Sequence, residues 1–170
     1  PNKEDLLSKI EQIRSTVNSK DLPNIYLFYG EINDDEMNQL FNIPKIKALV
    51  SLTRGEGWSK SFIEFTQSKK PLLVSGWSGH LDFCNPEFTT LIPGTLTPIH
   101  PSAQVKDMLV EGSQWFTADL GHAGSILKDC YENYSKYETM GKRLGFYCKD
   151  NFNQDKVKEK LYNILEANIK

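Results

Sequence analysis

One turn of the sequence combines residue types that suit the binding of a phosphate or a sugar. It runs Arg54-Gly55-Glu56-Gly57-Trp58-Ser59, between a predicted strand at 47–52 and a predicted helix at 59–68. Its two glycines allow the backbone to approach a ligand closely, and a helix capped by Ser59 directs free N–H groups toward the same place. The turn therefore predicts a phosphate site. A tight turn without a ligand explains the glycines equally well, because the spacing is neither a P-loop nor GxGxxG.

Two carboxylates add to the chemistry of this turn. Glu56 lies within it, and Glu64 follows eight positions later, inside the predicted helix and among apolar neighbours. A carboxylate in such surroundings is expected to be partly buried and to need a partner. The hydroxyls of a ribose are one such partner. The alternatives are solvent or Lys60, which precedes Glu64 by four residues.

Strands and helices alternate along the chain and so place this turn in a sheet. Apolar runs predict buried strands at 25–29, 47–52, 71–75 and 88–92, an edge strand at 112–116, and a proline-rich excursion at 93–107. Helical spacing predicts helices at 3–19, 59–68, 120–138 and 154–168, with a short helix after Asn33 or Asp34. This order predicts a single α/β domain over 1–170, a Rossmann-like three-layer α/β/α fold with a mainly parallel sheet. Ligands bind such sheets at the carboxyl ends of the strands.

Composition excludes several other functions. The 170 residues carry a net charge of −2, which argues against nucleic acid as a partner. No apolar run reaches the length of a transmembrane segment. The three cysteines and three histidines show no metal-binding spacing, so neither a metal nor a disulfide framework is expected. A cytoplasmic location fits reduced cysteines.

The run LVSLTRGEGWSKSFIEFTQSKKPLLVSGWSGHLDF resembles the group 1 glycosyltransferases, retaining enzymes of GT-B fold. That family carries E-G-F-G-x-P-x-x-E-A-x-x-x-G-x-P before a strand and a glycine-containing loop. Here Glu56, Gly57, Trp58 and Glu64 match in order, and Lys70-Pro71 precedes the strand. The chain departs from the pattern at Ser59 for the second glycine, Ser61 for the proline and Phe65 for the alanine. The resemblance covers about residues 20–165.

The resemblance implies a domain equivalent to the C-terminal half of a GT-B enzyme. It implies that Glu56 is catalytic and holds the donor sugar near its anomeric centre, while Glu64 binds the ribose. The other donor-binding residues are expected to be Arg54, Gly57, Trp58, Ser59, backbone near Ile32 against the base, and a loop with Gly79 and His80. For His80, a hydrogen bond that stabilises the loop is the alternative.

The implied donor is a nucleoside-diphosphate sugar, and no cofactor or metal is expected. The acceptor, a glycan or another hydroxyl compound, would bind an N-terminal GT-B domain that this sequence does not contain. The donor domain itself is expected to be incomplete at its N-terminus. Two alternatives stay open, a non-catalytic nucleotide or nucleotide-sugar binding module and an interaction protein that uses the fold without a ligand.

Overall fold

The structure is a computed structural model that describes residues 2–105 and 108–169. The chain forms two compact units, of which the first ends at Met37 and the second begins at Asn38. The first unit contains helix α1 (Lys3–Thr16). Asn2 caps this helix, because its side chain accepts a hydrogen bond from the Asp5 backbone N–H while the Asp5 carboxylate accepts one from the Asn2 N–H. The helix confirms the prediction at 3–19, ending three residues earlier.

The predicted buried strand at 25–29 is wrong. This segment forms no strand, and the exposed fractions of Ile25, Tyr26, Phe28 and Tyr29 lie between 52% and 80%. An apolar run becomes a strand only where another strand accepts its hydrogen bonds. The regular structure described within the first unit is helical, so the segment has no strand to pair with there.

The second unit contains a parallel sheet of three strands, in the order β1-β2-β3. The strands are β1 (Leu49–Ser51), β2 (Leu72–Ser75) and β3 (Thr90–Ile92). Leu49 pairs with Leu72, and Leu73 pairs with Thr90. All four residues of β2 are buried, as expected of a central strand covered on both faces. This arrangement confirms a mixed α/β fold with a parallel sheet, compatible with the Rossmann-like class.

An antiparallel ribbon follows the sheet. Strands β4 (Gly94–Pro98) and β5 (Gln114–Ala118) pair with each other. The ribbon corrects two predictions, because the excursion at 93–107 begins with a strand and the strand at 112–116 pairs with it rather than with the sheet edge. The short helix η2 (Pro101–Ala103) lies between the two strands. The sequence did not predict β4 because prolines at 93, 98 and 101 lie within or close to it, and proline is unfavourable in strands.

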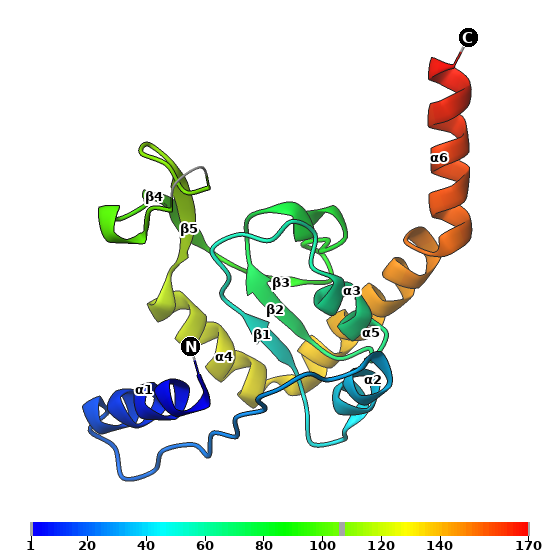
Figure 1. Ribbon diagram of the computed structural model, residues 1–170. Helices are drawn as coiled ribbons and strands as arrows, with labels where there is room; N and C mark the ends of the chain where they lie inside the picture. Colours follow the sequence, from blue (N-terminus) through cyan, green and yellow to red (C-terminus); the bar gives the residue numbers. More distant parts are fainter. Residues whose placement is uncertain (1, 106–107, 170) are drawn as a thin grey trace. The chain divides into compact units, whose positions relative to one another are not determined.

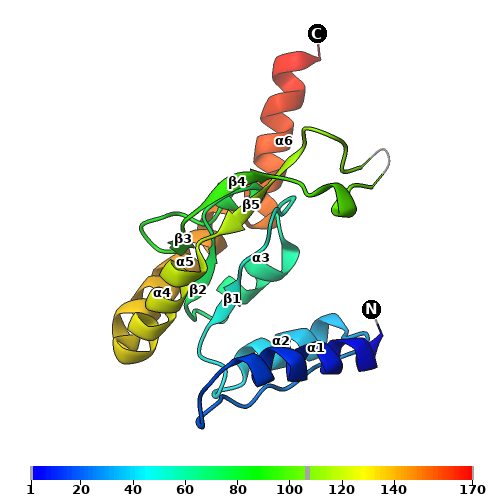
Figure 2. The ribbon, with the colours of Figure 1, turned by 90° about the vertical axis from the view of Figure 1, so that its left-hand side faces the viewer.

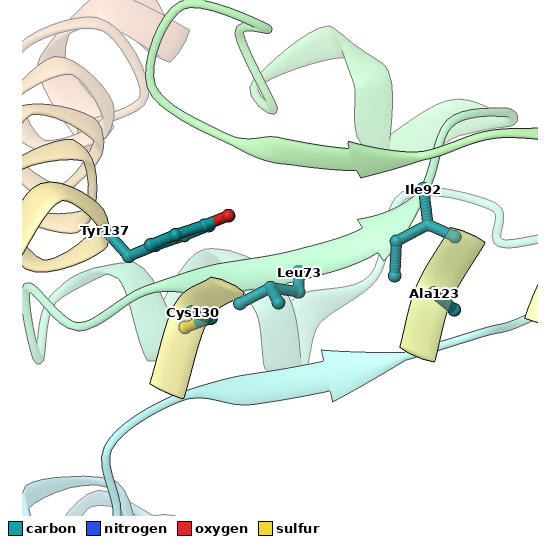
Figure 3. Close-up of a cluster of buried hydrophobic side chains, with 5 residues drawn as sticks. All are labelled: Leu73, Ile92, Ala123, Cys130 and Tyr137. Carbon is teal, nitrogen blue, oxygen red and sulfur yellow. The ribbon is translucent and has the colours of Figure 1, made fainter. Parts of the chain in front are cut away.

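Helices cover the two faces of the sheet (Figures 1 and 2). Helix α3 (Lys60–Thr66) lies on one face, and α4 (Leu120–Glu132) lies on the other. On the α4 face, Leu73 and Ile92 from the sheet pack with Ala123, Cys130 and Tyr137 (Figure 3). The short helix α2 (Asp34–Asn42) begins in the first unit and brings Phe41 edge-on to Phe65 of α3 within the second.

The predicted helix at 120–138 is two helices. α4 ends before Asn133, and α5 (Tyr134–Asn151) begins after it. Asn133 leaves helical geometry, and both its backbone N–H and its side chain bond to Asp129. The last helix, α6 (Gln154–Asn168), confirms the prediction at 154–168 and buries none of its side chains. Over residues 2–105 and 108–169, none of the helices has the length and apolar character needed to cross a membrane.

Candidate functional site

Two loops meet at the carboxyl edge of the sheet. One follows β1 and contains Glu56; the other follows β2 and contains Ser78. The Glu56 N–H donates to Ser78 Oγ at 3.0 Å, and the Ser78 hydroxyl donates to the Glu56 carbonyl at 2.7 Å. The Gly79 N–H also donates to the Glu56 carbonyl, at 3.0 Å. The turn predicted to bind a ligand is therefore fixed by the next loop of the sheet.

Gly79 is the point of closest approach between these loops. A Cβ built on Gly79 would lie 1.8 Å from the Gly57 carbonyl oxygen, so no other residue fits without moving the backbone. A Cβ on Gly57 itself would have nothing within 4 Å. The structure thus brings Glu56, Gly57 and Gly79 together. The two glycines have different roles. Gly79 allows the two loops to touch, whereas the space beside the Gly57 Cα is empty.

The start of α3 differs from the prediction. The helix spans seven residues, from Lys60 to Thr66, instead of the predicted 59–68. Ser59 occupies the N-cap position in the left-handed region, at φ 65°, and its side chain makes no capping hydrogen bond. Its hydroxyl lies 3.3 Å from that of Ser61 instead. The short helix provides a weaker dipole than the sequence predicts, and the Ser59 hydroxyl is not used as a cap.

Glu64 is half-buried on α3 and paired with Lys60. The Lys60 Nζ lies 3.3 Å from Glu64 Oε1, and the exposed fraction of the Glu64 side chain is 40%. This is the ion pair that the sequence offered as an alternative to ribose binding. An exposed pair four residues apart on a helix stabilises the fold by only about 0.3–0.5 kcal/mol. If Glu64 gave up this ion pair to bind another group, the loss of folding free energy would therefore be small.

Trp58 packs against other aromatic rings. Its ring lies 5.1 Å from that of Phe83 and 6.3 Å from that of Phe152, measured between centroids. Phe83 is fully buried and supports this contact. The indole therefore anchors the turn, and the contribution of Trp58 to a ligand would come from its backbone or its exposed edge.

Arg54 connects the turn to the ribbon. Its guanidinium lies 3.7 Å above the centroid of the Trp115 ring, a cation–π contact. Its carbonyl accepts a hydrogen bond from the Phe116 N–H at 3.0 Å. Phe116 in turn lies parallel to Trp77, with ring centroids 6.3 Å apart. The sequence did not predict these partners, because they follow from a ribbon whose first strand it missed.

His80 is a buried residue of the short helix η1 (Gly79–Asp82). Its Nε2 lies 2.7 Å from the Ser75 carbonyl and donates to it, and its ring meets Phe62 edge-on. Nδ1 has no partner among the described residues. With an exposed fraction of 0%, the ring does not face a ligand at the surface, and its bond to Ser75 stabilises the loop. Of the two roles offered by the sequence, the geometry favours the loop-stabilising one.

The backbone near Ile32 is the remaining predicted donor contact. Ile32 belongs to the first unit, where it is partly exposed in an irregular segment. Within the described part of the chain, no three histidines, cysteines or carboxylates lie close enough to hold a metal ion.

The chain was compared with protein families, curated proteins and solved structures. No family model, no curated protein and no solved structure matches this chain.

Proposed function

We propose that this chain binds a nucleoside-diphosphate sugar and forms the donor half of a retaining glycosyltransferase, a Rossmann-like domain equivalent to the C-terminal half of a GT-B enzyme. One observation carries the proposal. The turn with Glu56 and Gly57 is fixed by Ser78 and Gly79 at the carboxyl edge of a parallel sheet, where open α/β sheets bind their ligands. The ordered match from Glu56 to Glu64 supports the assignment to a sugar donor.

Each residue of the turn has a role in this proposal. The Glu56 carboxylate binds a hydroxyl of the donor sugar near its anomeric carbon. The Arg54 guanidinium and the N–H groups after Gly57 stabilise the charge that develops on the departing diphosphate. Glu64 exchanges Lys60 for the ribose hydroxyls.

The reaction breaks the bond between the anomeric carbon and the diphosphate oxygen. It forms a bond from the same face of that carbon to the acceptor oxygen. The hydroxyl proton of the acceptor leaves with the diphosphate or to solvent. In this proposal, the acceptor binds the other domain of the GT-B enzyme.

Ligand-induced stabilisation tests the proposal. The melting temperature is measured with UDP, GDP and ADP and with their glucose or mannose conjugates, since a ligand that binds only the folded chain raises it. Glu64→Gln should weaken binding of the preferred diphosphate by about tenfold or more, because hydrogen bonds to a carboxylate contribute about 1.5–3 kcal/mol. Glu132→Gln is a matched control, because Glu132 forms the same kind of pair, with Lys128 on α4.

The Glu56→Gln variant distinguishes binding of the sugar from binding of the nucleotide. It should weaken binding of the nucleotide sugar while leaving the affinity for the bare diphosphate unchanged. Equal losses for both ligands would contradict the division of roles between Glu56 and Glu64. Stabilisation by none of the nucleotides would overturn the donor site. Binding without sugar transfer in the presence of an acceptor domain would leave a nucleotide-sugar binding module.

A further inference from the structure

Trp77 is a partly exposed aromatic ring in the loop after β2. It follows β2 directly after Gly76 and precedes Ser78, which is bonded to Glu56. Its exposed fraction is 37%. The neighbouring turn presents Gly55 to it, and a Cβ on Gly55 would come within 3.5 Å of the Trp77 ring. The Gly55 backbone therefore lies beside the indole, and a side chain there would be in van der Waals contact with it.

The ring is also held in place before any ligand arrives. Phe116 lies parallel to it, with an interplanar angle of 5°. Phe116 is buried and is fixed by the hydrogen bond from its N–H to the Arg54 carbonyl. An indole fixed in this way loses little conformational entropy when a ligand stacks on it, which favours binding.

We propose that Trp77 is a stacking platform for a pyranose ring bound at this edge of the sheet. A pyranose has an apolar face of C–H groups, which suits an indole, and a rim of hydroxyls. The adjacent turn carries a carboxylate at Glu56, whose backbone is bonded to Ser78, and a guanidinium at Arg54; the proposal assigns these two groups to the hydroxyls. Apolar rings with a few convergent polar groups are typical of ligand sites. The inference rests on the proposed function, since it assigns a contact to the same site.

The test follows each tryptophan separately by ¹⁹F NMR. The chain has three tryptophans, so incorporation of 5-fluorotryptophan gives three signals, assigned with Trp58→Phe, Trp77→Phe and Trp115→Phe variants. Three sets of probes are titrated: the bare diphosphates UDP and GDP, UDP-glucose and GDP-mannose, and the methyl glycosides of glucose, mannose and galactose. The Trp77 signal should shift with a nucleotide sugar or a methyl glycoside and not with the bare diphosphates. A shift with the nucleotide sugar alone identifies the donor sugar, and a shift with the glycoside identifies a free sugar that binds without a nucleotide.

Variants measure the contribution of the ring. Trp77→Ala should weaken sugar binding by about tenfold, and Trp77→Phe, which keeps an aromatic surface on Phe116, by less. Tyr131→Ala is the matched control, because it removes an aromatic ring that is 87% exposed near the end of α4. Melting temperatures establish that each variant is folded.

The outcomes distinguish the two proposals. If nucleotides bind but no sugar shifts the Trp77 signal, the stacking platform is wrong, whereas the proposed donor site remains supported. A shift with the glycosides in a chain that binds no nucleotide supports the platform and contradicts the proposed function. A shift with bare diphosphates that the sugar does not enlarge shows a nucleobase on the ring, and it also overturns the platform.

Discussion

Gly79 makes the geometry of the candidate site depend on a single residue. Its missing side chain lets the loop after β2 touch the Gly57 carbonyl, and its N–H holds the Glu56 carbonyl. Gly57 has open space at the same contact. The two glycines therefore differ in function although they are indistinguishable as residue types.

Substitution of each glycine by alanine tests this difference. Gly79→Ala forces the loops apart and should lower the free energy of unfolding by about 1–3 kcal/mol, the usual cost of overpacking. It should also abolish any ligand binding that depends on Glu56. Gly57→Ala, the matched control, should leave stability nearly unchanged, because its Cβ meets no atom within 4 Å. Urea unfolding of both variants gives the comparison. Equal losses would show that the loops do not press on Gly79.

The sequence placed the residues of the turn correctly, but it did not predict how they are held. The turn follows β1 as predicted, and the possibility that Glu64 pairs with Lys60 was stated. The hydrogen bonds between Glu56 and Ser78 join residues 22 positions apart. Such contacts depend on strand pairing and on the path of both loops, so the residue pattern of one segment does not contain them.

Elements with several independent signals were predicted best. The strands at 47–52 and 71–75 combine apolar runs with turns and with a helix between them, and both exist as β1 and β2. The run at 25–29 had apolar composition alone, and in the structure it remains irregular and exposed. The break at Asn133 was missed because apolar residues continue at helical spacing on both sides of it. Composition decides where burial is favourable, and pairing decides whether a strand forms.

Helix α5 depends on glycines for close packing. A Cβ on Gly141 would lie 2.4 Å from the Lys70 carbonyl carbon, and one on Gly145 would lie 2.6 Å from the Thr66 carbonyl oxygen. These contacts place α5 against the end of α3 and the turn before β2. Glycine is unfavourable inside a helix, so the packing compensates for it at these positions.

Glycines on α4 and α5 should therefore respond oppositely to substitution. Gly141→Ala should lower the free energy of unfolding by about 1–3 kcal/mol, because the helix must move away from Lys70. Gly124→Ala on α4 should raise it by about 0.5–1 kcal/mol, since its Cβ would meet no atom within 4 Å and alanine favours the helix. Chemical denaturation measures both changes. Stabilisation by Gly141→Ala would contradict the close packing of α5.

Among the residues that the structure describes, the buried ones all lie in the second unit, and they include all three cysteines. Burial, with a smaller effect of the neighbouring Cys148 thiol, raises the pKa of Cys84 to about 12. Burial also raises the pKa of Cys130 and of Cys148. The folded chain therefore keeps thiol protons that an unfolded chain releases above about pH 8.5. Because of these thiols, the free energy of unfolding depends on pH in the alkaline range.

The sign of this linkage follows from the number of bound protons. Above about pH 8.5 the unfolded chain binds fewer protons than the folded one, so the free energy of unfolding falls as pH rises toward the pKa of the folded state. Cys84 alone should account for a loss of about 1–2 kcal/mol between about pH 8 and pH 10. Tyr137, whose pKa burial and the Asp129 carboxylate raise to about 12, should add to the fall only above about pH 10, where a free tyrosine ionises.

Urea unfolding in reducing buffer across this pH range checks the prediction. Cys84→Ala should be less stable than the natural chain at pH 8, because it leaves a small cavity. Its stability should nevertheless fall less steeply toward pH 10, since it carries one thiol proton fewer. Tyr131→Phe changes an exposed hydroxyl and should keep the natural slope. Parallel slopes for Cys84→Ala and the natural chain would mean that Cys84 ionises as readily in the folded chain as in the unfolded one, and would contradict the raised pKa that follows from its burial.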